Sequence, residues 1–315
     1  MPKTLWIVIL LALFQLGQAQ ESLTLYAAGA QLPDLNALVE AFKTTNPGVE
    51  IKLFRSGAGE VITKLRAELE AGNPQPDLIW LVGTQFFQEL STKGLLRRVP
   101  PTMPGFPLRF AYEGGKYYEV RFLYNILAVN RNRLPKPPSS WRELTNPEYR
   151  GLVVMADPNY SGPALAALGT LTERYGFGYF EALKANGLRV EQSNPLLQQK
   201  LAQGEYALAI TNDYGVRQEI AKGSPLSVVY PSDGAILAPT PIGIPTWSKN
   251  PALAEKFLRF LLSDRGQRVF VERGYYPVLT GLPGPQGSPL KILSMQAKGV
   301  SAELLFHFNA LFGLR

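Results

Sequence analysis

The sequence has 315 residues, of which 46% are hydrophobic and 18% are charged. This composition excludes a disordered chain, and the length exceeds what one hydrophobic core comfortably serves, so we expect two domains. The 32 lysines and arginines against 25 acidic residues give a formal charge of +7. This excess suits an anionic ligand. The basic residues are dispersed and form no run interleaved with aromatics, so we expect no nucleic-acid partner.

The first residues have the pattern of a secretory signal peptide, which we predict to be residues 1–19. Lys3 precedes an apolar stretch at 5–16, and Gly17-Gln18-Ala19 follows. The stretch is shorter than the ~20 apolar residues that span a bilayer, so we expect cleavage and a soluble mature protein in the periplasm or outside the cell, with an uncleaved signal anchor as the alternative. The sequence contains no cysteine, so no disulfide and no lipid-modified cysteine can form.

The following residues alternate between strand and helix patterns. In chain order we predict a strand at 23–27, a helix carrying 35–42, a strand at 49–55, a helix carrying 61–69, a strand at 77–82, strands within 117–129, a strand at 152–156, a helix at 163–175, a helix at 196–202, a strand at 206–211, one helix from 251 that ends within 266–274, and a last helix near 302–311. This alternation predicts α/β sheets that bind ligands at the carboxyl ends of their strands.

Several short motifs follow one another in a specific order along the chain. They include Leu23-Thr24-Leu25-Tyr26, Ser56-Gly57-Ala58-Gly59-Glu60, Lys93-Gly94-Leu95-Leu96, Pro138-Ser139-Ser140-Trp141, Asp157-Pro158, Ser161-Gly162, Lys222-Gly223-Ser224-Pro225, Val229-Tyr230-Pro231 and Asn250-Pro251. Each motif is weak alone, but the ordered set resembles the extracellular solute-binding proteins of ABC importers, in the group of ferric-ion, organophosphate and phosphonate binders.

The resemblance implies an α/β, two-lobed periplasmic-binding-protein fold of the type II kind. Each lobe would be a mixed sheet flanked by helices, with the ligand cleft between the lobes. We expect residues 21–121 plus 241–282 to form the first lobe, and residues 122–240 plus 290–315 to form the second lobe with the C-terminal helix packed on it. The protein would capture its ligand by lobe closure and deliver it to a membrane permease.

Two predicted helix starts favour an anionic ligand on physical grounds. Ser56, Gly57, Ala58 and Gly59 lie between a strand and a helix, and Ser161-Gly162 occupies the same kind of position in the other lobe. Free backbone N–H groups and the helix dipole attract negative charge there. The alternative is that both serines are simple N-caps. In the family the turn that here contains Gly29 and Ala30 also touches ligand, and ferric binders place a histidine in it.

Asp213 and Tyr214 bear on the class of ligand. Ferric-binding members resemble Asn-Asn-Tyr-Tyr at this point, whereas this chain has Asn212-Asp213-Tyr214-Gly215. A carboxylate beside one tyrosine can accept hydrogen bonds from a phosphosugar or aminophosphonate, and Asp233 could supply a second acceptor. If iron were bound instead, Tyr214, Asp213 and Glu60 with an anion would be its ligands. An N-cap for Asp213 and a turn position for Asp233 are the alternatives.

Other residues receive less weight. Arg121 or Arg217 could reach an anion, although solvated surface arginines are commoner. The pairs Tyr117-Tyr118 and Tyr275-Tyr276 are more typical of core than of a metal site, because neighbouring strand residues point to opposite faces. The only histidine, His307, falls in the last helix.

The function we predict is reversible capture of a small anionic solute, phosphorylated or phosphonate, for an ABC importer. Ferric-iron binding is the alternative ligand class, and presentation of a ligand to a membrane sensor is the alternative role. No nucleophile elbow, histidine or cysteine cluster, or Walker lysine is present, so we expect neither an enzyme nor a cofactor. We also expect a monomer whose protein partner is the ABC permease.

Overall fold

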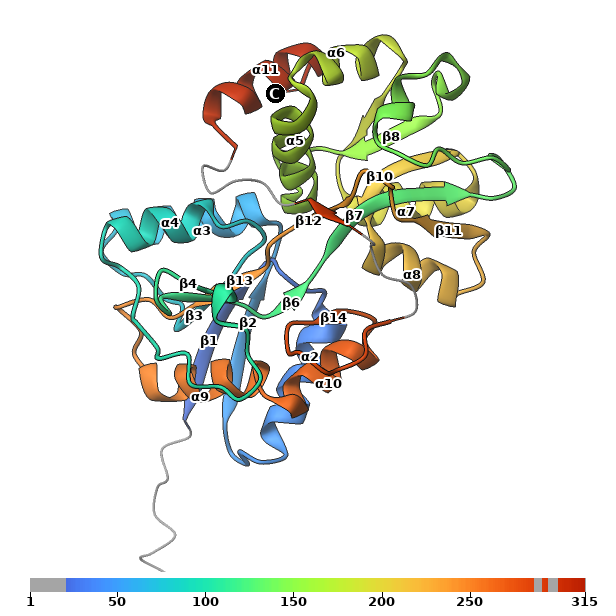
Figure 1. Ribbon diagram of the computed structural model, residues 1–315. Coiled ribbons are helices and arrows are strands. Elements are labelled where there is room, and N and C mark those ends of the chain that lie inside the picture. Colours follow the sequence, from blue (N-terminus) through green and yellow to red (C-terminus); the bar gives the residue numbers. More distant parts are fainter. Residues whose placement is uncertain (1–20, 286–290, 294–299, 315) are drawn as a thin grey trace, which may run out of the picture.

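The computed structural model describes residues 21–285, 291–293 and 300–314, so the predicted signal peptide lies outside the described residues. It is an α/β protein with two sheets, each in its own lobe (Figure 1). The predicted fold class is therefore confirmed. The lobe limits given above stay a prediction.

The first sheet contains strands from two distant parts of the chain. Parallel pairs join β1 to β2 and β3, while β13 pairs antiparallel with both β3 and β5. Its order is β2-β1-β3-β13-β5-β4, with bounds β1 Ser22–Ala27, β2 Glu50–Arg55, β3 Leu78–Trp80, β4 Ala111–Tyr112, β5 Tyr117–Glu119 and β13 Pro241–Gly243.

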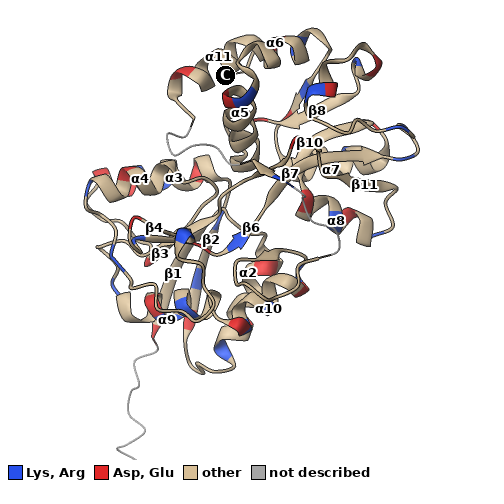
Figure 2. Ribbon diagram, viewed as in Figure 1, with Lys and Arg blue, Asp and Glu red and all other residues tan. Residues whose placement is uncertain are grey.

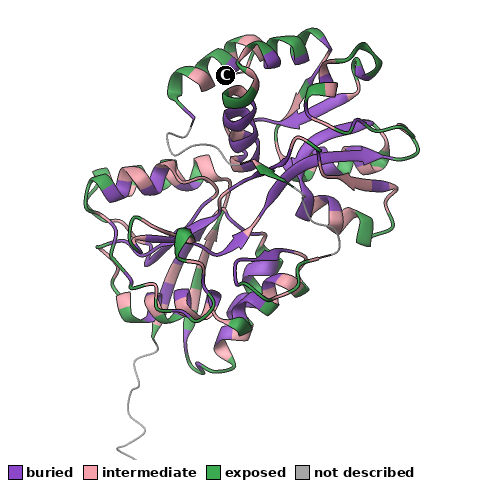
Figure 3. Cartoon of the chain, viewed as in Figure 1, coloured by how far each residue is buried: buried purple, intermediate pink, exposed green. Residues whose placement is uncertain are grey.

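The second sheet is built around β7, Tyr124–Asn130, all of whose residues are buried (Figure 3). Strand β7 pairs antiparallel with β10, β11 and β12, whereas β8 runs parallel to β10 and β9. The other strands are β8 Val153–Ala156, β9 Arg189–Glu191, β10 Leu208–Asn212, β11 Leu226–Val229, β12 Ala235–Leu237 and β15 Ile292–Leu293. A short pair of β6, Arg121–Phe122, and β14, Tyr276–Pro277, lies between the two sheets in Figure 1.

Helices cover both faces of each sheet. The apolar faces of α3 and α4 form one core layer of the first lobe and those of α2, α9 and α10 the other, and alternating β1 residues contribute to both layers. The helices are α2 Leu32–Lys43, α3 Ala58–Glu70, α4 Gln85–Thr92, α5 Gly162–Tyr175, α6 Gly178–Ala185, α7 Asn194–Gln203, α8 Asp213–Ala221, α9 Pro251–Leu261, α10 Asp264–Glu272 and α11 Ala302–Phe312, with 3₁₀ turns η1 Leu108–Phe110, η2 Arg142–Thr145 and η3 Pro147–Tyr149.

The single helix predicted from residue 251 is wrong, because the structure has two. Helix α9 ends at Leu261, and Ser263 begins α10 by accepting a hydrogen bond on its hydroxyl from the Gly266 N–H. An added Cβ at Gly266 would lie 2.1 Å from the Phe260 carbonyl oxygen. The two helices therefore pack too closely at this corner for any residue but glycine. The apolar periodicity continues through the corner and conceals it.

The predicted C-terminal helix is present as α11 and packs on the second lobe. Phe308 is fully buried, and its ring contacts that of Phe180 with centroids 5.5 Å apart. His307 lies on this helix, as the sequence indicated, and its ring is near that of Phe177.

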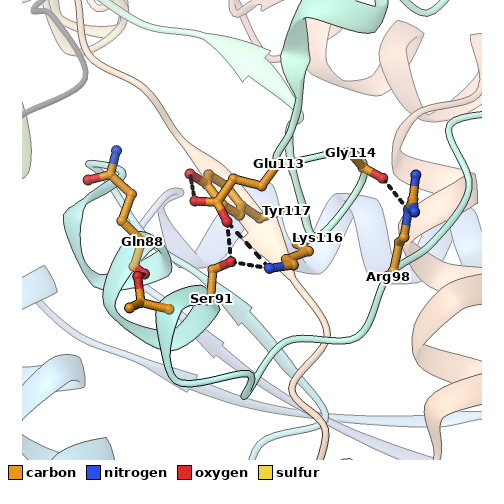
Figure 4. A network of polar contacts seen from close by, with 8 residues as sticks. Gln88, Ser91, Arg98, Glu113, Gly114, Lys116 and Tyr117 are labelled. Carbon is orange, nitrogen blue, oxygen red and sulfur yellow. Dashed lines mark hydrogen bonds and ion pairs between the residues drawn. The ribbon is translucent and has the colours of Figure 1, made fainter.

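The β4–β5 hairpin is fastened to α4 by polar contacts (Figure 4). Glu113 accepts hydrogen bonds from the Ser91 hydroxyl and from Tyr117, and pairs with Lys116 at 3.6 Å. Arg98 donates to the Gly114 carbonyl at 2.7 Å. These contacts fix the edge of the first sheet away from the ligand cavity described below.

Elsewhere, acidic and basic residues are interspersed over both lobes without a block of one sign (Figure 2).

Candidate ligand-binding site

A cavity of about 490 Å³ lies between the lobes, at the carboxyl ends of strands from both sheets. This is the position expected for a ligand of an α/β sheet, and the volume is in the range of small-molecule sites. Its walls come from the segments that follow β1, β2, β3, β8, β9 and β10. The lining residues are 28–31, 55–58, Glu60, Val82, Arg121, Leu123, 160–163, 192–195, Asn212, Tyr214 and Tyr275.

Most of the residues predicted for the site share this cavity. Gly29, Ala30, Ser56, Gly57, Ala58, Ser161, Gly162 and Tyr214 line it, as does Glu60 of the iron alternative. Gly59, Asp213 and Asp233 do not line it. The predicted residues of the two helix starts thus meet from opposite lobes, whereas the two predicted carboxylates lie elsewhere.

The start of α3 differs in detail from the expectation. Its N-cap is Gly57, which has no side chain to occupy the first turn, and the Ser56 hydroxyl instead donates to the Glu60 carboxylate. Because the first N–H groups of a helix lack intrahelical acceptors, those of α3 are left for a ligand or water at this end. The positive end of the helix dipole faces the same space.

At the start of α5, Ser161 is an N-cap. Its hydroxyl oxygen accepts from the Ala164 N–H at 3.2 Å and from the Asn194 side-chain amide at 2.6 Å. The Asn194 carbonyl in turn accepts from the Thr211 hydroxyl at 2.8 Å. This chain of hydrogen bonds ties the starts of α5 and α7 to the end of β10, so the second-lobe wall is held as one unit.

The lobes meet closely at the rim of the cavity. An added Cβ at Gly162 would lie 2.5 Å from the Val82 Cβ, and one at Gly59 would lie 3.0 Å from the Asn159 carbonyl oxygen. Real Cβ atoms essentially never approach another atom as closely as the 2.5 Å at Gly162. These glycines therefore allow the start of each helix to approach the opposite lobe closely.

Asp213 is buried beneath the cavity wall. Its carboxylate accepts hydrogen bonds from the backbone N–H groups of Tyr124, at 3.2 Å, and Tyr214, at 2.9 Å. Burial raises the pKa of Asp213 to about 6, against the opposing charge of Arg217. The N-cap of α8 is the neighbouring Asn212. Asp213 thus positions the α8 start and presents no oxygen to the cavity.

Asp233 holds a corner of the second lobe. Its carboxylate accepts hydrogen bonds from the Trp141 N–H at 3.0 Å and from the Tyr175 hydroxyl at 2.6 Å. The turn interpretation weighed in the sequence matches this position better than a ligand role. Each carboxylate accepts from a backbone N–H far away in sequence, that of Tyr124 for Asp213 and that of Trp141 for Asp233, which no local pattern reveals.

Tyr214 reaches from the second lobe into the first. Its hydroxyl donates to Asp34 at 2.5 Å, and its ring stacks on Tyr275 with centroids 3.8 Å apart. Tyr275 donates to the same Asp34 oxygen at 2.7 Å, and Arg273 pairs with the other at 2.7 Å. Burial, followed by the hydrogen bond to Asp34, raises the pKa of Tyr214 to about 12, so its phenol stays protonated at neutral pH.

Arg121 is one of the two arginines that the sequence offered as contacts to an anion, and its burial is what the sequence did not show. It is only 2% exposed, yet it borders the cavity, and its guanidinium lies 3.8 Å above the Tyr275 ring. One nitrogen donates to the Gly29 carbonyl, while Nε and Nη1 have no hydrogen-bond partner among the described residues. A buried cation with two free donors is costly unless an acceptor arrives. Arg121 lies at the start of β6, between the lobes, and only the folded structure shows this position.

Glu119 lies near Arg121 and gives the protein a pH dependence. Its carboxylate is fully buried and accepts from the Thr240 N–H at 2.6 Å and from Tyr112 at 3.1 Å. Burial raises the pKa of Glu119 to about 7, with the hydrogen bonds and Arg121 opposing the rise. The folded state therefore holds this proton more tightly than the unfolded chain, whose glutamate titrates near pH ~4.3.

We expect this burial to reduce stability as pH rises. The stabilisation from the bound proton is complete below about pH 4 and is lost as pH rises through about 7. At about pH 8, the free energy of unfolding of Glu119→Gln should exceed that of the parent by on the order of 2 kcal/mol. This difference in stability should vanish near pH ~4. Denaturant unfolding across pH measures it, with the exposed Glu50→Gln as control. Parallel curves for parent and Glu119→Gln would contradict the assignment.

The described residues contain no group of three or more histidine, cysteine, aspartate or glutamate side chains that could hold a metal ion. The oxygen-rich place that borders the cavity is the Asp34–Tyr214–Tyr275 cluster, in which both phenols already donate to the carboxylate. None of the helices in the described ranges is long and apolar enough to cross a membrane.

Comparison with known proteins places the chain in a family. A family model described as bacterial extracellular solute-binding protein matches residues 37–289. The gamma-aminobutyric acid-binding protein of Pseudomonas aeruginosa is 25% identical over 289 residues, which cover 81% of this chain and 80% of the relative. Among solved structures, iron-bound HitA of Pseudomonas aeruginosa superposes with a TM-score of 0.80 at 23% identity, covering 92% of this chain and 99% of HitA.

A second solved structure is similar to the same extent. The periplasmic binding protein AfuA of Actinobacillus pleuropneumoniae, with fructose-6-phosphate bound, superposes with a TM-score of 0.77 at 23% identity, covering 94% of this chain and all (100%) of AfuA. At these identities the structures establish the shared two-lobed fold, and the family model matches most of the chain. The chain therefore belongs to the bacterial extracellular solute-binding proteins.

Proposed function

We propose that this protein is the solute-binding component of an ABC importer and that its solute is a small anion, with a phosphorylated or phosphonate compound favoured. The observation that carries the proposal is the buried Arg121 side chain, which borders the interlobe cavity and whose Nε and Nη1 donors, both buried, have no hydrogen-bond partner among the described residues. Planar guanidinium donors match the oxygens of phosphate and phosphonate groups, and a desolvated cation binds them strongly.

The surroundings of Arg121 support the same charge. The starts of α3 and α5 face the cavity from opposite lobes, and Arg55 lines it as a second cation. Arg55 is itself placed by hydrogen bonds to the Ala30 carbonyl at 3.2 Å and to Gln31 at 3.0 Å. An anion bound here would meet one helix start from each lobe and two guanidinium groups, against the Glu60 carboxylate, which also lines the cavity and accepts from Ser56.

The phenol groups argue against ferric iron as the cargo. Iron prefers phenolate and carboxylate oxygens, but burial and Asp34 hold the pKa of Tyr214 at about 12, and burial raises the pKa of Tyr275 well above its ordinary value. Asp213, the second ligand that the sequence offered, does not line the cavity. An iron site would also have to form beside the Arg121 cation.

Export, permease docking and release of the solute complete the proposed role. Members of this family that serve ABC importers bind a solute and pass it to a membrane permease, and we propose a periplasmic or extracellular monomer that does the same. A protein that presents its ligand to a membrane sensor would share the site, and deletion of the cognate permease separates the two roles by its effect on uptake.

The ligand class is tested by thermal shift on chelated mature protein. The panel is fructose 6-phosphate, 2-aminoethylphosphonate, inorganic phosphate, ferric citrate and the zwitterion gamma-aminobutyric acid. A ligand at a hundredfold its dissociation constant adds about 2.7 kcal/mol to the stability of the folded state, which is easily seen. A shift with a phosphate ester or phosphonate supports the proposal. A shift with ferric iron alone, accompanied by tyrosinate colour, or with gamma-aminobutyric acid alone, would overturn it.

A further inference from the structure

The segment between β8 and α5, residues 157–162, forms the second-lobe ligand loop, because it carries Ser161 and Gly162 to the cavity. Its internal hydrogen bonds centre on Asp157. The Asp157 carboxylate accepts from the Asn159 N–H at 2.8 Å, and its carbonyl accepts from the Ser161 N–H at 2.9 Å. These bonds give the loop its shape. These internal bonds do not attach the loop to the rest of the molecule.

The loop is joined to the C-terminal helix by a pair of side-chain amides. The Asn159 Nδ2 donates to Asn309 Oδ1 at 2.8 Å, and the Asn309 Nδ2 donates back to Asn159 Oδ1 at 3.1 Å. The two residues are 150 positions apart in sequence, and both are partly buried. Because each amide satisfies the other, the pair fixes the orientation of both side chains as well as their distance.

Helix α11 is itself anchored at two places. Phe308, the residue before Asn309, is fully buried against Phe180 of α6. Just before the helix, the Val300 carbonyl accepts a hydrogen bond from Gln85 of α4, in the first lobe. The helix therefore connects the second-lobe ligand loop both to the body of its own lobe and to the opposite lobe.

The position of the loop matters because it abuts the other helix start. An added Cβ at Gly59 of α3 would lie 3.0 Å from the Asn159 carbonyl oxygen, so the loop and α3 are at contact distance. A displacement of Asn159 would change the separation of the α3 and α5 starts, between which we place the anion. Productive contacts of this kind require positioning to within a fraction of an ångström.

We propose that α11 is a brace for the second-lobe ligand loop, and that Asn309 is the positioning residue through which it sets the place of Ser161 and Gly162 in the cavity. This inference rests on the proposed function, since it assumes that the loop contacts the solute. Asn309 itself does not border the cavity.

The brace is tested first without any ligand, by hydrogen exchange of the full mature chain. Asn309→Ala should speed exchange of the loop amides of Asn159 and Ser161 by about fivefold, the effect of losing one net hydrogen bond. Amides of the buried strand β7 should keep their parental rates. The exposed Phe306→Ala, on the same helix, is the matched control and should change neither region. Unchanged loop exchange in Asn309→Ala, or equal acceleration in β7, would overturn the proposal.

Pairing variants separate a specific contact from a general weakening of α11. Asn159→Ala also removes the hydrogen bond from the Asn159 side chain to the Asp157 carboxylate at 2.7 Å, so it should accelerate loop exchange at least as much as Asn309→Ala does. The double variant should exchange no faster than Asn159→Ala alone, because the contact with Asn309 is already lost. Asn309→Asp still accepts from Asn159 but no longer donates to it, so it should restore part of the protection. Strict additivity of the two alanine variants would overturn the assignment of Asn309 as the partner.

Titration then links the brace to solute capture. With fructose 6-phosphate and inorganic phosphate as probes, Asn309→Ala should raise the dissociation rate by about threefold to tenfold, since an ordered loop lowers the cost of binding. If Arg121→Met abolishes phosphate binding while Asn309→Ala leaves its rates unchanged, the brace is wrong and the proposed function stands. If neither these probes nor 2-aminoethylphosphonate binds the parent, the proposed function fails, and loop exchange alone decides the brace.

Discussion

Replacing Arg121 with methionine is expected to weaken binding of an anionic probe by about 30-fold or more, because truncating one partner of a desolvated charge pair typically costs ~2–5 kcal/mol. Methionine keeps an apolar side chain over Tyr275 but removes the free donors at Nε and Nη1. Isothermal titration with fructose 6-phosphate or 2-aminoethylphosphonate measures the loss. Arg121→Lys keeps the charge without the planar fork, so we expect it to lie between methionine and the parent.

The same variant separates binding from folding. The unliganded parent buries a guanidinium whose Nε and Nη1 have no partner in the described part of the chain, so its removal should change the free energy of unfolding by no more than about 1 kcal/mol. The exposed Arg66→Met, which alters net charge equally at the surface, is the control and should bind normally. Parental affinity in Arg121→Met would remove the observation on which the anionic solute rests, and collapse of the unliganded fold would make Arg121 a structural residue.

Replacing Asp34 with alanine is expected to lower the free energy of unfolding by about 3–5 kcal/mol. The carboxylate is 1% exposed and accepts from Tyr214, Tyr275 and Arg273, so its loss leaves two buried phenols and a guanidinium without their acceptor. Denaturant unfolding measures the change. Asp34→Asn keeps a carbonyl acceptor and should cost distinctly less than alanine.

Glu40→Ala is the matched control for Asp34, because it lies on the same helix with an exposed side chain. It should alter the free energy of unfolding by less than about 0.5 kcal/mol. A cost below about 1 kcal/mol for Asp34→Ala would contradict a structural cluster at this position. Since Tyr214 comes from the second lobe, Asp34→Ala should also weaken probe binding by loosening the contact between lobes.

Residue patterns were sufficient to predict the α/β class, whereas the two-lobed arrangement was predicted from the family resemblance. Alternating apolar residues in β1, the apolar run of β10, and helical periodicity in α2, α3 and α5 predicted elements that the structure contains with small shifts at their ends. The helix starts at Gly57 and Ser161 were also predictable, because a strand, a small-residue turn and a helix succeed one another locally. The α9–α10 corner was missed, since its cause is the contact of Gly266 with the Phe260 carbonyl in three dimensions.

The sequence by itself thus determined the α/β class and the two helix starts that face the cavity, because periodicity and turn chemistry act over a few neighbouring residues. Tertiary structure alone decided which polar groups remain available there. It placed the Tyr124 N–H against Asp213 and the Trp141 and Tyr175 donors against Asp233, and it left Arg121 buried with two donors that have no partner among the residues described. Hydrogen-bond satisfaction and burial depend on partners far away in sequence, so no local pattern contains them.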